Sequence, residues 1–182
     1  MGALDLVRDA IPDPARDLKL NLQSVMAETS LTPAQRWGVA VTAAVTSRNA
    51  RLRAAVLDDA RDAVAGAVVD DALAAAALMG MNNVYYRFRH LIDKPEYKEK
   101  PARLRMNRLA KPAANKVDFE LFALAASAIN GCGACMQAHE KVVLAGGLTE
   151  DQVHDAIRLA SIVNGAAIAL DLVTDVRTEP VG

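Results

Sequence analysis

Cys132 and Cys135 are the two cysteines of this 182-residue chain, and together they form a Cys-x-x-Cys motif. His139, one of three histidines, follows Cys135 by four residues. Residues at i, i+3 and i+7 share a helix face, so the cysteines could bridge and His139 could take a proton from Cys135. A thiol becomes nucleophilic when it is deprotonated. We therefore interpret residues 120–140 as a redox-active dithiol with its own base.

The flanking residues predict two helices around this motif. Glu120–Ile129 lacks Pro and Gly and is rich in Ala and Leu, which favours a helix, and Asn130-Gly131 is a typical helix stop. A second helix is predicted from Cys132 to Leu144, so the cysteines occupy its first turn, where the helix dipole favours thiolate. Glu120 would reach His139 if the two helices fold back antiparallel, which spacing alone does not decide.

Other interpretations of the cysteines stay open at this point. Cys132, Cys135, His139 and one carboxylate could hold zinc, although four-ligand zinc sites usually draw on a second cysteine pair, which this chain lacks. The cysteines could also be buried and inert. A purely structural disulfide is disfavoured because so short a loop constrains the unfolded chain little.

A length of 182 residues predicts one domain, 1–182, or two small repeats, and the absence of a strand pattern indicates an all-α fold. Hydrophobic residues make up 52% of the chain and aromatics only 4%, so the apolar content is mostly Ala, Val and Leu, which suits closely packed helices. A chain with few large side chains often buries further surface by forming oligomers. A shift of 84 positions aligns 36–83 with 120–167, which suggests a duplicated helical unit.

Charge and hydropathy exclude several classes of function. The net charge of −1 does not indicate nucleic-acid binding. Apolar runs such as 72–81 are shorter than the roughly 20 residues that a membrane helix needs, and the N-terminus does not resemble a signal peptide. We therefore expect no membrane segment and a cytoplasmic location, where a Cys-x-x-Cys is more often catalytic than structural.

Further helices are predicted from capping residues and apolar periodicity. They cover about 3–11, 15–27, 33–47, 51–65 and 72–89, the last capped by Asp70 or Asp71, followed by a helix capped by Asn115 and one from Thr149 to about Arg177.

Residues 91–116 are irregular and hold eight Lys or Arg against three acidic residues, which predicts either a solvated connection or a docking strip for an acidic partner. The chain has no dinucleotide fingerprint, so the electrons for redox chemistry must come from an outside dithiol or protein.

Several segments make the chain similar to the alkyl hydroperoxide reductase D family, within the carboxymuconolactone decarboxylase-like superfamily. The resemblance covers almost the whole chain. Its segments are Met79-Gly80-Met81-Asn82-Asn83-Val84-Tyr85-Tyr86-Arg87, Leu104-Arg105-Met106-Asn107, and Phe119-Glu120 through Cys132, Cys135 and His139-Glu140.

This resemblance implies an all-helical, homotrimeric antioxidant protein with weak peroxidase activity and no bound cofactor. Dihydrolipoamide, carried by the lipoyl-bearing acyltransferase of a 2-oxo acid dehydrogenase complex, would supply electrons, which pass to a peroxiredoxin of the alkyl hydroperoxide reductase C type. The family's functional residues fall on Glu120, Cys132, Cys135 and His139. Some members carry a further histidine where this chain has Ala134.

The mechanism implied is that His139, polarised by Glu120, deprotonates Cys135, which attacks the peroxide, and that Cys132 then closes the disulfide. The helix dipole alone would favour Cys132 as the more acidic thiol, whereas His139 and the resemblance favour Cys135. Rival hypotheses are a thiol–disulfide adaptor with negligible peroxidase activity, a decarboxylase or ring-opening enzyme of the superfamily, and a zinc protein.

Overall fold

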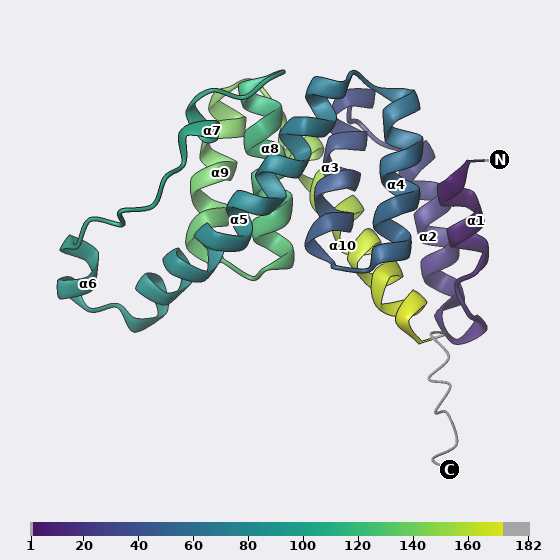
Figure 1. Ribbon diagram of the computed structural model, residues 1–182, viewed down its shortest axis with the longest axis horizontal. Coiled ribbons are helices and arrows are strands. Elements are labelled where there is room, and N and C mark those ends of the chain that lie inside the picture. The colour runs from purple at the N-terminus through teal and green to yellow at the C-terminus, as the bar shows by residue number, and fades with distance from the viewer. Residues whose placement is uncertain (1, 173–182) are drawn as a thin grey trace, which may run out of the picture.

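The computed structural model describes residues 2–172, which form ten α-helices, one 3₁₀ turn (η1) and no strand, as the all-α prediction requires (Figure 1). The predicted end of the last helix near Arg177 lies outside the described residues. The elements in chain order are α1 (Ala3–Asp9), η1 (Asp13–Ala15), α2 (Arg16–Ala27), α3 (Pro33–Thr46), α4 (Ala50–Ala63), α5 (Gly66–Ile92), α6 (Pro95–Glu99), α7 (Asn107–Ala110), α8 (Lys116–Ile129), α9 (Gly133–Ala145) and α10 (Glu150–Asp171).

Helices α3 and α8 lie at the centre of the core, and both pack against α5 and α10. Nearly every residue from Phe119 to Ser127 is buried, which explains why the middle of α8 is almost entirely apolar. Gly38 of α3 sits against the ring of Phe122, and a Cβ atom there would overlap that ring. The small residues of α3 therefore let α8, which carries Glu120, approach closely.

Local capping residues begin the helices where the sequence predicts. Thr32 and Thr149 form capping boxes with the glutamines three residues later, and Asn49 and Asn115 accept hydrogen bonds from the first turns of α4 and α8. The cap of α8 matters for the site, because it sets where Glu120 lies along that helix.

The predicted start of α5 is wrong. The helix begins at Gly66, and Asp71 lies inside it, completely buried. The Asp71 carboxylate instead pairs with Arg108 at 2.8 Å and accepts hydrogen bonds from the backbone N–H groups of Ala113 and Ala114 at 2.8 and 2.7 Å. A tertiary contact, and not a helix cap, therefore accounts for this aspartate.

The irregular segment 91–116 contains two short helices, α6 and α7. The last turns of α5, which follow its contacts with α8 and α9, and the short helix α6 extend away from the helical body as an arm (Figure 1). Apolar side chains are exposed along this arm, including Val84, Phe88 and Leu91, the last at 72%. Among the described residues, Ile92 and Tyr97 add to the exposed apolar side chains of this arm.

Judged by length and hydropathy alone, α10 is the one helix of the described residues that could cross a membrane. Its buried side chains, such as Leu159 and Val163, pack in the core, and the helix contacts α2, α3 and α8. A core helix of a folded domain meets the same measures.

The suggested duplication concerns α3–α5 and α8–α10. The cap residues Asn49 of α4 and Cys132 of α9 lie 83 positions apart, one fewer than the shift taken from the sequence. Each follows a residue with positive φ, Arg48 at 64° and Gly131 at 68°. These matching turns support the duplication, which stays a prediction.

Candidate functional site

The turn between α8 and α9 places the first cysteine at a helix start. Gly131 has the left-handed conformation, with φ of 68°, and its N–H donates to the Ala128 carbonyl while the Cys132 N–H donates to the Ser127 carbonyl. This pattern is a Schellman motif, which ends α8. Cys132 is the N-cap of α9 and Cys135 the third residue of that helix, as the sequence predicts.

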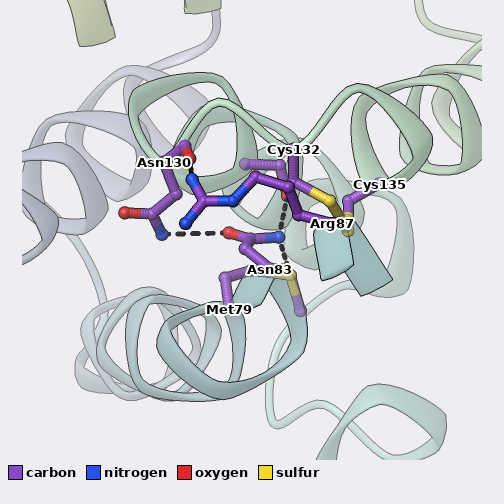
Figure 2. The surroundings of a disulfide bond; sticks show 7 residues. Met79, Asn83, Arg87, Asn130, Cys132 and Cys135 are labelled. Carbon is purple, nitrogen blue, oxygen red and sulfur yellow. Dashed lines mark hydrogen bonds between the residues drawn. A yellow bond between two sulfur atoms is a disulfide. The ribbon is translucent and has the colours of Figure 1, made fainter. Parts of the chain in front are cut away.

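Side chains of α5 hold this turn from below (Figure 2). Asn83 accepts a hydrogen bond from the Asn130 side chain at 2.9 Å and donates one to the Ser127 hydroxyl at 2.9 Å. Arg87 donates to the Asn130 carbonyl at 2.5 Å. These contacts fix Ser127 and Asn130, which precede Gly131 in the chain, and so help to determine where Cys132 lies.

Cys132 and Cys135 are joined as a disulfide, with their Cα atoms 5.3 Å apart. The two sulfurs differ in access, because Cys132 is fully buried whereas Cys135 is 6% exposed. An incoming molecule therefore meets Cys135 first, and Cys132 lies behind it.

Glu120 of α8 and His139 of α9 are in direct contact, with Nδ1 of His139 2.6 Å from Oε2 of Glu120. Both side chains are largely buried. An ionised carboxylate only accepts hydrogen bonds, so it selects the tautomer in which Nδ1 carries the proton and Nε2 has a free lone pair. The contact that spacing left undecided is thus made, and it leaves Nε2 available as a base.

Cys135 and His139 line one pocket of about 220 Å³. Three segments build it, and the lining residues are Asn82 and Tyr86 of α5, Met106 and Leu109 in and beside α7, and Ala134, Cys135, Ala138 and His139 of α9. The pocket wall is mainly apolar, with Asn82, the Tyr86 hydroxyl and His139 as its polar groups. The structure thus brings the four predicted residues together as two bonded pairs, and each pair contributes one residue, Cys135 or His139, to the pocket. Their catalytic roles stay predictions.

Sequence reasoning missed the pocket residues outside α9. The sequence assigns no individual role in the site to Asn82, Tyr86, Met106 or Leu109. A signal for Asn82 was present, because two adjacent asparagines are unfavourable in a helix interior unless tertiary contacts use them. The two asparagines make different contacts: Asn83 bonds to Asn130 in the turn, and Asn82 lines the pocket.

Within residues 2–172, no group of three or more His, Cys, Asp and Glu side chains is arranged to hold a metal ion. The zinc-site hypothesis therefore gains no support from this part of the chain.

The fold and the site define an all-helical protein with a cysteine pair at a helix start and a Glu–His pair beside it. A model of the carboxymuconolactone decarboxylase family matches residues 95–174, which include all four of these residues. At the level of whole proteins, the chain is 67% identical over 172 residues to a protein from Anaeromyxobacter dehalogenans (strain 2CP-C) named alkyl hydroperoxide reductase AhpD, covering 94% of this chain and 92% of that protein. It is 48% identical over 169 residues to the Brucella suis protein of the same name, covering 93% and 97%. The chain therefore belongs to the AhpD family of alkyl hydroperoxide reductases, as its resemblance predicts.

Proposed function

We propose that the protein is an antioxidant alkyl hydroperoxide reductase whose Cys132–Cys135 centre is reduced by dihydrolipoamide and supplies electrons to a peroxiredoxin. The observation that carries this proposal is the Glu120–His139 contact beside the pocket that exposes Cys135. The names of the relatives support the substrate class.

In the oxidative half-reaction, Nε2 of His139 takes the thiol proton of Cys135. The thiolate attacks the terminal oxygen of the hydroperoxide, a sulfur–oxygen bond forms, and the oxygen–oxygen bond breaks. The alkoxide takes the proton back from His139 and leaves as an alcohol. Cys135 is then a sulfenic acid. Glu120 stabilises the imidazolium that forms during this step, because its carboxylate accepts from Nδ1.

The Cys132 thiol then displaces water from the sulfenic acid and closes the disulfide. Two thiols have been oxidised for one peroxide reduced. Dihydrolipoamide restores them by exchange: one of its thiolates attacks Cys135, the more accessible sulfur, and its second thiol resolves the mixed disulfide. Dihydrolipoamide has then given two electrons to the protein disulfide and leaves as lipoamide.

The donor in the cell is proposed to be the lipoyl-bearing acyltransferase of a 2-oxo acid dehydrogenase complex. A lipoyl group on a long arm can enter a 220 Å³ pocket that a protein surface cannot. Met106 and Leu109, which line that pocket, belong to the segment 91–116, which holds eight Lys or Arg. That arrangement supports docking of an acidic donor or acceptor protein there. The cytoplasm is the proposed location, because these partners act in a reducing compartment.

A homotrimer is proposed as the working form. The arm formed by α5 and α6 supports it, since Val84, Phe88, Leu91 and Ile92 are 43–72% exposed on one protruding element. Contiguous exposed apolar surface of this kind marks interaction sites. Sedimentation of the purified chain would test the proposal, with a trimer expected for the native chain and a monomer for Leu91→Lys. A monomeric native chain would refute it.

Steady-state turnover tests the proposed activity. The protein is mixed with dihydrolipoamide and tert-butyl hydroperoxide, with and without a peroxiredoxin, and alcohol production is measured. Slow turnover alone and faster turnover with the peroxiredoxin are expected, both absent in Cys135→Ser. Turnover only in the presence of the peroxiredoxin would favour the adaptor hypothesis, and none in either case would refute the proposal.

A further inference from the structure

Asn82 is a buried side chain with an unsatisfied polar atom. It is 4% exposed, and its carbonyl oxygen has no hydrogen bond within the described residues. Its neighbour Asn83 is equally buried but has both amide groups bonded. Leaving a buried amide unsatisfied is costly, so such a group in a native protein calls for an explanation.

The position of Asn82 explains why it is unsatisfied, because this side chain lines the pocket that also contains Cys135 and His139. An amide carries N–H donors and a carbonyl acceptor, and its two ends exchange places when the group turns over. Met106, Leu109 and Ala138 make the neighbouring wall apolar. The pocket thus places an amide with an unsatisfied oxygen in the same cavity as the Cys135 nucleophile, in surroundings that suit an alkyl chain.

We propose that Asn82 binds the peroxide group of a small alkyl hydroperoxide and so acts as a catalytic residue in the oxidative half-reaction. This inference rests on the proposed function and adds the group that holds the substrate. A hydroperoxide has an O–H donor and two acceptor oxygens, which match the amide. Its alkyl group lies against Met106 and Leu109, so the pocket favours alkyl hydroperoxides over hydrogen peroxide.

The amide N–H acts on the oxygen that leaves. As the Cys135 thiolate attacks the terminal oxygen, the oxygen–oxygen bond breaks and negative charge develops on the oxygen attached to carbon. A hydrogen bond from Asn82 stabilises that charge in a pocket with a mainly apolar wall, until His139 returns the proton and the alcohol forms. Donors aimed at a developing oxyanion typically contribute 10²–10³-fold in rate.

Asn82→Leu tests this role, since leucine is close in size and has no polar atom. Reduced protein is mixed with tert-butyl hydroperoxide and with hydrogen peroxide by stopped flow, and the disulfide form is mixed with dihydrolipoamide and with dithiothreitol. On the order of 100-fold slower oxidation by the alkyl hydroperoxide is expected, with both reductions unchanged. The melting temperature should stay equal or rise, because an unsatisfied polar group has been removed.

Two further variants complete the design. Asn21→Leu, on the exposed face of α2, makes the same change away from the site and should leave every rate unchanged. Asn82→Ala provides a smaller side chain should leucine prevent folding, and the same loss of oxidation rate is expected.

Several results would overturn the proposal. The first is a folded Asn82 variant that is oxidised at the native rate. The second is an equal slowing of oxidation and reduction, which would indicate a structural role. The third is a slowing only of the reduction by dihydrolipoamide, which would mean that the amide binds the electron donor. A native protein that does not react with any peroxide would refute the proposed function itself.

Discussion

Nδ1 of His139 contacts Oε2 of Glu120 at 2.6 Å, and this contact joins α8 to α9 at mid-helix while the turn between them carries Cys132. The carboxylate therefore sets the tautomer of the imidazole that lines the same pocket as Cys135. Glu120 acts through His139, and its contribution is to the basicity and orientation of the ring.

Glu120→Gln should slow the oxidation of the reduced protein by an alkyl hydroperoxide on the order of 10- to 100-fold, the range found for carboxylates that support metal-bound histidines in the same way. The amide still accepts from Nδ1 but does not stabilise the imidazolium. Stopped-flow rates over a range of pH measure this. Glu140→Gln, the exposed neighbour of His139, is the matched control and should react at the native rate. Equal rates for both variants would remove Glu120 from the mechanism.

Asp71→Ala should destabilise the fold by about 2–4 kcal/mol, because it leaves Arg108 and two backbone N–H groups without their carboxylate. Denaturant unfolding measures the loss, and amide exchange at Ala113 and Ala114 should accelerate. Asp70→Ala, one residue earlier and exposed, should change stability little. Similar losses in both variants would show that the buried network is not the cause.

Gly38→Ala should cost about 1–3 kcal/mol, since the added methyl overlaps the ring of Phe122 and forces α3 and α8 apart. Gly66→Ala is the control at the start of α5, where nothing lies within 4 Å of the added methyl. That change should instead stabilise by up to about 1 kcal/mol, through helix propensity. A stable Gly38→Ala protein would mean that the two helices tolerate wider spacing.

Asp155 makes part of the stability depend on pH. Burial raises the pKa of its carboxyl, but hydrogen bonds from the Ser30 N–H and hydroxyl, with Arg158 nearby, lower the pKa below 3.8 overall. Because the folded pKa is depressed, the stabilisation is present above pH 3.8 and is lost as the pH falls through the folded value.

Asp155→Asn should therefore lower stability by about 1–2 kcal/mol at neutral pH, with the difference shrinking in strong acid. Thermal unfolding at several pH values measures this, with Asp62→Asn, at an exposed aspartate, as control. A difference that does not change with pH would contradict the account.

The sequence predicts the features of this fold that depend on neighbouring residues. Caps at Thr32 and Asn115, the helix stop at Gly131 and the placement of Cys132 at a helix start follow from local hydrogen bonding, so they are readable from a few residues. The predicted start of α5 is wrong because it depends on distant residues: Asp71 bonds to residues about 40 positions away in the chain.

The site shows the same division. Cys132, Cys135 and His139 share one helix, so their arrangement follows from spacing. The Glu120–His139 contact depends on how α8 crosses α9, and the pocket requires Asn82 of α5 and Met106 beside α7 to meet α9. Such contacts between helices depend on how the helices pack in three dimensions, which helical periodicity does not predict.

The central claim is that Cys135 is the residue that reacts with peroxide and that Cys132 resolves it. The most direct measurement is a stopped-flow titration of the reduced protein with a small alkyl hydroperoxide, in which thiol loss and disulfide formation are read by mass. The native chain should lose two thiols per peroxide, Cys132→Ser should stop at a sulfenic acid, and Cys135→Ser should not react. Peroxide-dependent oxidation that persists in Cys135→Ser, or a native chain that reacts with lipoamide but with no peroxide, would contradict the claim.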